Sequence, residues 1–109
     1  MDKGKLIHPR DAWPTGEVEI AGVGKVKIRA LTRGEALQVR ALSHDPVLFD
    51  RKLCAFCLTD PVLTEDEVGE WQANTLPAEI ERVTDAIFAL SGLKDGAAKE
   101  AYKSAGSGD

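Results

Sequence analysis

The chain of 109 residues has the length of one domain, and its 43% hydrophobic and 29% charged residues are typical of a globular protein rather than a disordered one. Its 14 Lys and Arg against 18 Asp and Glu residues give a net charge of −4, which argues against a protein that binds the nucleic-acid phosphate backbone. The sequence has no apolar run of about 18 residues that would span a bilayer, and no signal pattern follows the charged N-terminus. We therefore expect a cytoplasmic protein that binds neither nucleic acid nor membrane.

Residues 1–16 are predicted to form an irregular N-terminal arm. Pro9 and Pro14 each favour extended backbone in the residue before them, and Gly16 ends the segment. Trp13 lies here outside any amphipathic pattern. It either pins the arm onto the body or docks onto a neighbouring molecule, so it is a candidate partner contact.

A β-hairpin is predicted over residues 17–31. Val18 and Ile20 alternate with glutamates, and after a glycine-containing turn Val26 and Ile28 alternate with basic residues. The opposite charges on the two strands favour this pairing. A lone hairpin is only marginally stable, so its apolar face is expected to pack on the rest of the chain. Its other face carries three basic candidate partner contacts: Lys25, Lys27 and Arg29.

Four helices are predicted after the hairpin, over about 33–43, 46–58, 64–73 and 77–91. Thr32 and Thr64 each begin a capping-box pattern, and Asp45 is a capping residue followed by a proline in the first turn. The last helix has the clearest apolar periodicity, and the Ser-Gly-Leu sequence at 91–93 is a typical helix end.

Together these elements predict an α+β fold that is mainly α. A small N-terminal hairpin is followed by about four short helices packed as a bundle, in one globular domain over residues 17–93. Residues 94–109 are rich in Gly, Ala, Ser and charged residues and are predicted to be a flexible tail, whose Gly-Ser end is either natural or a remnant of cloning.

Charge is unevenly distributed along the chain. Residues 1–33 carry seven basic and four acidic residues, a net charge of +3, whereas residues 34–93 carry four basic and eleven acidic ones, a net charge of −7. Either these parts attract each other between copies, which would give self-association, or they are two solvated surfaces of one monomer.

The Cys54-x-x-Cys57 pattern is the one motif that suggests redox or metal chemistry. The motif lies within a predicted helix on its apolar side, where burial raises the pKa of a thiol, and the two histidines lack the paired spacing of zinc ligands. We therefore interpret both cysteines as core residues, with a dithiol oxidoreductase as the enzymatic alternative.

No other pattern predicts catalysis or a cofactor. The acidic residues at 65–67 are explained by the helix dipole and lack the glycine turn of a calcium loop. No Ser-His-Asp or Cys-His arrangement is evident. We expect a protein that is not an enzyme, with no catalytic, cofactor-binding or metal-binding residues. Trp71 follows the inward spacing of its helix and is either core or a partner anchor.

Over residues 17–93 the order of these elements resembles the tail assembly chaperones of long-tailed, siphovirus-type bacteriophages. A basic hairpin leads into VKIRALTRGE, a helix ends in CLTDPVLTEDEV, and LPAEI opens a final helix that closes in IFALSGL. The resemblance is a pattern of caps, prolines and aliphatic residues and carries over no family binding residue.

The resemblance implies a chaperone that binds the tape measure protein in the host bacterial cytoplasm and keeps it soluble. Such proteins help to recruit tail tube subunits, in many phages through a longer product made by a ribosomal frameshift, and are not expected in the mature virion. The alternative is a non-enzymatic virion adaptor, such as a head–tail connector-type module.

Overall fold

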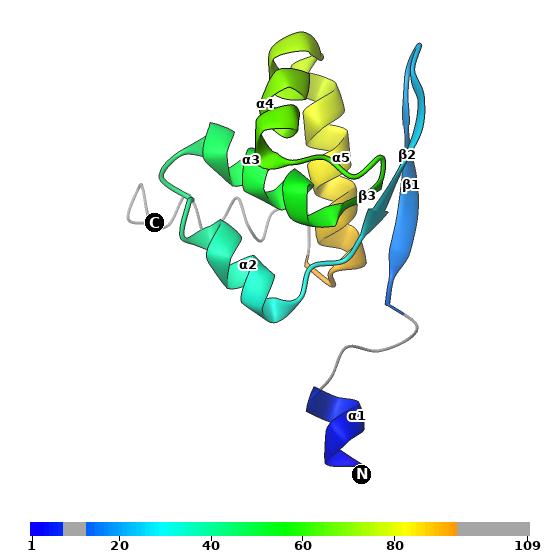
Figure 1. Cartoon of the computed structure of the whole chain (residues 1–109), viewed down its shortest axis with the longest axis vertical. Coiled ribbons are helices and arrows are strands. Elements are labelled where there is room, and N and C mark those ends of the chain that lie inside the picture. The colour runs from blue at the N-terminus through cyan, green and yellow to red at the C-terminus, as the bar shows by residue number, and fades with distance from the viewer. Residues whose placement is uncertain (8–12, 94–109) are drawn as a thin grey trace.

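The computed structural model describes residues 1–7 and 13–93 and has an α+β fold, with a three-stranded antiparallel sheet and five helices (Figure 1). The strands are β1 (Thr15–Ile20), β2 (Gly24–Arg29) and β3 (Leu58–Asp60), in the order β1-β2-β3. The helices are α1 (Lys3–Ile7), α2 (Arg33–Arg40), α3 (Pro46–Cys57), α4 (Glu65–Asn74) and α5 (Pro77–Leu90). The predicted fold class is confirmed.

The predicted hairpin is confirmed as β1 and β2. Glu17 lies opposite Lys27 and Glu19 opposite Lys25, so each acidic residue of β1 faces a basic residue of β2. The turn between the strands contains Gly22 at φ 78°, a left-handed conformation that glycine adopts without steric strain. Opposite charges thus line the exposed face of the hairpin, and its aliphatic residues point to the core.

The predicted helix caps are also confirmed. The side chains of Thr32 and Thr64 each accept a hydrogen bond from the backbone three residues on, completing capping boxes at α2 and α4. Asp45 caps α3 through the amides of its first turn. At the end of α5, Gly92 has a φ of 80° and Leu93 N–H donates to Phe88 O at 2.9 Å, the pattern of a Schellman motif.

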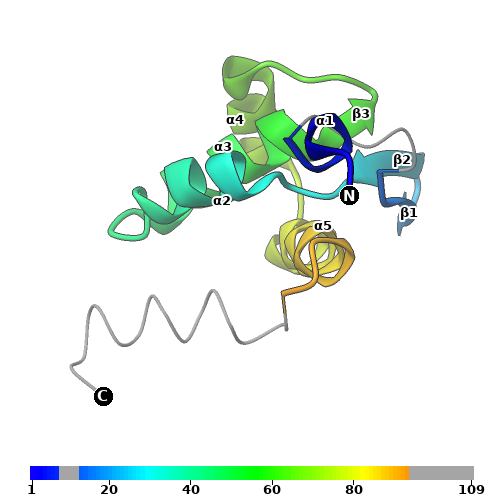
Figure 2. The same ribbon diagram turned by 90° about the horizontal axis from the view of Figure 1, so that it is seen from below.

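The hydrophobic core lies between the sheet and the helices. Helix α5 packs against β1 and β2 as well as against α3, and α3 also contacts α2 and α4. Figure 2 shows α5 apart from the layer formed by α2, α3 and α4. Ile28 from the sheet, Leu53 from α3 and Ile87 from α5 are among the largest fully buried side chains. The core is therefore mainly aliphatic, as the low aromatic content indicates.

The N-terminal arm and several element boundaries differ from the sequence prediction. Residues 1–16 were predicted to be irregular, but Lys3–Ile7 form α1, whose start is capped by a hydrogen bond from Gly4 N–H to the Asp2 carboxylate at 2.9 Å. Strand β1 begins at Thr15, and α2 ends at Arg40 rather than at residue 43. The predicted tail over 94–109 lies outside the described residues.

Strand β3 was not predicted. Its three residues follow α3 directly, and Leu58 pairs with Ile28 of β2 while Asp60 pairs with Lys27. A strand of three residues is too short to show an alternating pattern of apolar and polar residues. Its extended conformation depends on its pairing with β2. Among the helices of the described residues, none is long and apolar enough to cross a membrane.

Candidate functional site

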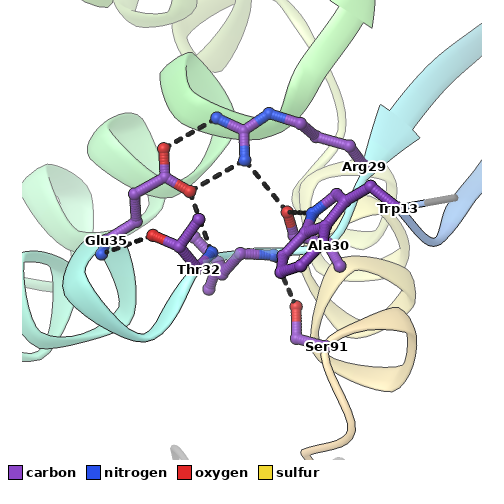
Figure 3. A network of polar contacts seen from close by, with 7 residues as sticks. Trp13, Arg29, Ala30, Thr32, Glu35 and Ser91 are labelled. Atoms are coloured by element: carbon purple, nitrogen blue, oxygen red, sulfur yellow. Dashed lines mark hydrogen bonds and ion pairs between the residues drawn. The ribbon is translucent and has the colours of Figure 1, made fainter. Parts of the chain in front are cut away.

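Three parts of the chain that are distant in sequence meet at Ala30, between β2 and α2 (Figure 3). The indole Nε1–H of Trp13 donates a hydrogen bond to Ala30 O at 2.7 Å, and Arg29 Nη1 donates to the same oxygen at 3.0 Å. Next to them, Leu31 N–H donates to Ser91 Oγ at 2.9 Å, which ties the end of α5 to this junction. The junction therefore fastens the arm, the sheet and α5 together.

The role of Trp13 follows from the proline beside it. Ala30 N–H donates to Pro14 O at 2.9 Å, which continues the ladder of β1 and β2 by one residue. Proline has no N–H to return the second bond of this pair. The indole N–H of Trp13 donates to Ala30 O in its place. The half-buried ring of Trp13 thus contacts the body, which fits the first of its two predicted roles.

Arg29 forms hydrogen bonds and an ion pair within the domain. Its two terminal nitrogens donate to the two carboxylate oxygens of Glu35 at 2.8 and 2.7 Å, and its side chain is 27% exposed. Hydrogen bonding to Arg29 is the main cause that holds the pKa of Glu35 below its ordinary value. The same carboxylate raises the pKa of Arg29. The ion pair therefore joins β2 to the first turn of α2.

The other predicted contact residues lie apart. Lys25 and Lys27 are exposed on the outer face of β2, and Lys25 Nζ lies 3.9 Å from a Glu17 carboxylate oxygen. Trp71 is half-buried and packs against the hydrophobic core from α4. The structure thus brings Trp13 and Arg29 together at Ala30, leaves the lysines on the sheet surface and places Trp71 elsewhere.

A groove of ≈ 410 Å³ runs between α2 and α3, at the start of α4. Its apolar lining comes from Ala41, Leu42 and Leu48, and its polar lining includes a 3.3 Å ion pair between Lys52 and Glu65. Gln38 also lines the groove. Leu48 is 38% exposed, although it is aliphatic. The groove thus combines three apolar and three polar lining residues.

Two further aliphatic side chains of α2 and α3, outside the groove lining, are exposed. Val47 of α3 is 53% exposed and Leu37 of α2 is 48% exposed. Leu37 and Leu42 both belong to the helix that the sequence predicts over residues 33–43. Periodicity could not show which of them the fold leaves uncovered, because that depends on where α3 crosses α2.

Cys54 and Cys57 are both buried in α3, and neither forms a disulfide. Burial is the main cause that raises the pKa of each thiol to about 12. At neutral pH both are therefore protonated and poorly nucleophilic. This environment fits the interpretation of the two cysteines as core residues.

Within residues 1–7 and 13–93, no group of three or more His, Cys, Asp or Glu side chains could hold a metal ion. The acidic residues at the start of α4 act in its first turn, where Glu67 completes the capping box and Glu65 pairs with Lys52. The chain matches no model of a known protein family, and no curated protein sequence or solved structure matches it.

Proposed function

We propose that the protein is a tail assembly chaperone of a long-tailed bacteriophage, which binds the tape measure protein in the host cytoplasm and keeps it soluble. It would also help to recruit tail tube subunits, through a longer frameshifted product. The observation that carries the proposal is the order of capped elements from the hairpin to the helix end at Leu93, over which the sequence resembles these chaperones.

The groove between α2 and α3 supports this proposal as a surface for the client. A tape measure protein is long and helical, and it has apolar surface that must be shielded before assembly. An amphipathic helix can place its apolar side against Ala41, Leu42 and Leu48, in the manner of other helix-in-groove complexes. Each contact is small, but many copies along one client shield a large surface.

Co-expression with the tape measure protein of the same phage tests the proposal. We expect the client to be soluble and to copurify with the chaperone in a complex of many copies. Leu48→Asp should abolish both effects, because it places a charge in the groove. The change is compatible with folding, since Leu48 lies in the first turn of α3, where an acidic residue is favourable.

Val62→Asp is the matched control. Val62 is 74% exposed and lies between β3 and α4, so the same charge is added outside the groove lining. The proposal fails if the tape measure protein does not bind the wild-type chain, or if both variants lose binding equally. Mass spectrometry of purified virions gives a separate test, because a chaperone should be absent and a virion adaptor or connector should be present.

A further inference from the structure

The outer edge of β1 is a regular strand edge at the side of the sheet. In the order β1-β2-β3, strand β1 has β2 on one side, and no strand of the described residues pairs with its other side. Edge strands are commonly protected by proline, charged side chains (lysine above all), bulges or shortness, and the charges on β1 are two glutamates. Residues 15–20 contain no proline or lysine and pair with β2 in unbroken register. The opposite edge, β3, has three residues and a register shift.

The backbone groups that face this edge can be identified from the ladder. Ala30 N–H donates to Pro14 O, so the pair formed by these two residues is a hydrogen-bonded one. Hydrogen-bonded and non-hydrogen-bonded pairs alternate along an antiparallel ladder. Thr15, Glu17 and Glu19 therefore direct their N–H and C=O groups away from β2. They form a row of donors and acceptors at the spacing that an additional strand requires.

The two faces beside this row differ in chemistry. On the inner face, Val18 and Ile20 are buried, and a Cβ at Gly16 would lie 3.3 Å from the side chain of Leu90, so α5 packs directly beneath β1. On the outer face, the glutamates at 17 and 19 stand at the edge and the lysines of β2 stand one strand further in.

We propose that the outer edge of β1 accepts an extended segment of another protein in which basic residues alternate with apolar ones. The backbone of the segment would pair with the edge groups of Thr15, Glu17 and Glu19, as in other cases of β-strand addition. Its basic side chains would lie beside the two glutamates, where opposite charges across strands are favourable. Its apolar side chains would lie on the inner face, on the side of α5.

The same charges disfavour a second copy of this chain as the occupant. A two-fold antiparallel pairing of β1 with β1 centred on Glu17 or Val18 places glutamates opposite glutamates, and like charges across strands are destabilising. The edge lies on the opposite side of the molecule from α2 and α3 in both views (Figures 1 and 2). The inference therefore does not depend on the chaperone proposal, which concerns the groove between those helices.

Binding of three synthetic peptides to the full chain tests the inference. The first is Thr-Val-Lys-Val-Lys-Val-Lys-Thr, the second has glutamate in place of each lysine, and the third is the first with alternate backbone nitrogens methylated. We expect the lysine peptide to bind at least about tenfold more tightly than either of the others. The glutamate peptide lacks the opposite charges beside Glu17 and Glu19, and the methylated peptide lacks the backbone donors that pair with the edge.

Amide hydrogen exchange shows where the peptide binds. In the free chain the amides of Thr15, Glu17 and Glu19 should exchange rapidly, whereas those of Val18 and Ile20 are held by the ladder. The lysine peptide should slow exchange at the three edge amides. Equal binding of the lysine and glutamate peptides, undiminished binding of the methylated peptide, or unchanged exchange at millimolar peptide would overturn the inference.

Two substitutions at one position separate backbone pairing from charge. Glu17→Pro removes an outward N–H that the ladder does not use, and we expect it to abolish binding of the lysine peptide. Glu17→Gln keeps the N–H and should weaken binding only a few-fold. Circular dichroism should show whether each variant is folded. If the proline variant is unfolded, the comparison of the three peptides still tests the inference. A free chain that forms a dimer with these edge amides protected would identify a second copy as the occupant instead.

Discussion

Glu35 connects two elements through one carboxylate, so its replacement tests how the sheet is joined to α2. Its oxygens accept two hydrogen bonds from Arg29, and Oε1 also accepts the backbone N–H of Thr32 at 2.9 Å to complete the capping box. Glu35→Ala removes the hydrogen bond from Thr32 N–H, worth about 1 kcal/mol, and leaves Arg29 without its charged partner. For this half-buried pair we expect a total loss of about 2–3 kcal/mol.

Glu35→Gln separates the two contributions. A glutamine oxygen still accepts the Thr32 N–H, but the ion pair with Arg29 is lost, so we expect a loss of about 1 kcal/mol. In a domain of this size 1 kcal/mol corresponds to roughly 4–8 °C in Tm. Thermal and urea unfolding followed by circular dichroism should therefore rank the chains as wild type, Glu35→Gln and Glu35→Ala in decreasing stability.

The pH dependence of the same series gives the sharper test. Arg29 lowers the pKa of Glu35 in the folded state, so the unfolded state binds its proton at higher pH. The stabilisation is therefore complete above the unfolded pKa of about 4.3 and is lost as the pH falls through the folded pKa. The difference between wild type and Glu35→Gln should be constant from pH 6 to 8 and should shrink below pH 4. A difference of the same size at pH 7 and pH 2.5 would refute the reasoning.

Three further predictions concern Trp13, Gly69 and the two buried cysteines. Trp13→Phe removes one 2.7 Å hydrogen bond and should lower the urea unfolding free energy by about 1 kcal/mol, while Trp13→Tyr serves as a second aromatic control. Gly69→Ala should raise Tm by a few degrees, because alanine favours a helix by about 1 kcal/mol. Its Cβ would lie 3.2 Å from the guanidinium end of Arg51, whose Nε donates to Gln72 Oε1 at 3.0 Å, so this end must shift slightly. A lower Tm would show that the hydrogen bond to Gln72 holds the guanidinium in place. Burial raises the pKa of Cys54 and Cys57 to about 12 in the folded state, whereas an unfolded thiol has a pKa of about 8.5. As the pH rises above about 8.5 the unfolded state therefore loses these protons before the folded state does, and the free energy of unfolding should fall. A double alanine variant with an equally steep loss between pH 9 and 11 would contradict this.

Most of the fold could be predicted from local sequence patterns. The hairpin alternation, both capping boxes and the glycine after α5 each depend on residues within a few positions of one another. These signals are strong because the chemistry that they report is local. Strand β3 could not be found in this way, since Leu58 and Asp60 become a strand only beside β2, about thirty residues earlier.

The contacts at Ala30 were only partly predictable. Trp13 was recognised as unusual because it lies outside any amphipathic pattern, but its hydrogen bond to Ala30 O depends on the register of β1 and β2. Ser91 was interpreted only as part of a helix end. Its hydroxyl also accepts the N–H of Leu31, a contact between residues sixty positions apart. Pairing with distant segments thus decided which candidate residues remained exposed.

The same reasoning explains why the basic face of the hairpin is not a uniform binding surface. Arg29 is held by Glu35, and the lysines of β2 stand next to the glutamates of β1, so much of the positive charge is balanced inside the sheet. The negative charge stays unbalanced at the outer edge of β1, where Glu17 has a basic neighbour on one side and none from the described residues on the other.

A partner that pairs with β1 and a helix that enters the groove would contact different elements and could be bound at the same time. Leu48→Asp should then leave peptide binding at the edge unchanged, and Glu17→Pro should leave client binding in the groove unchanged. Loss of both activities in either variant would show that the two surfaces are coupled through the fold.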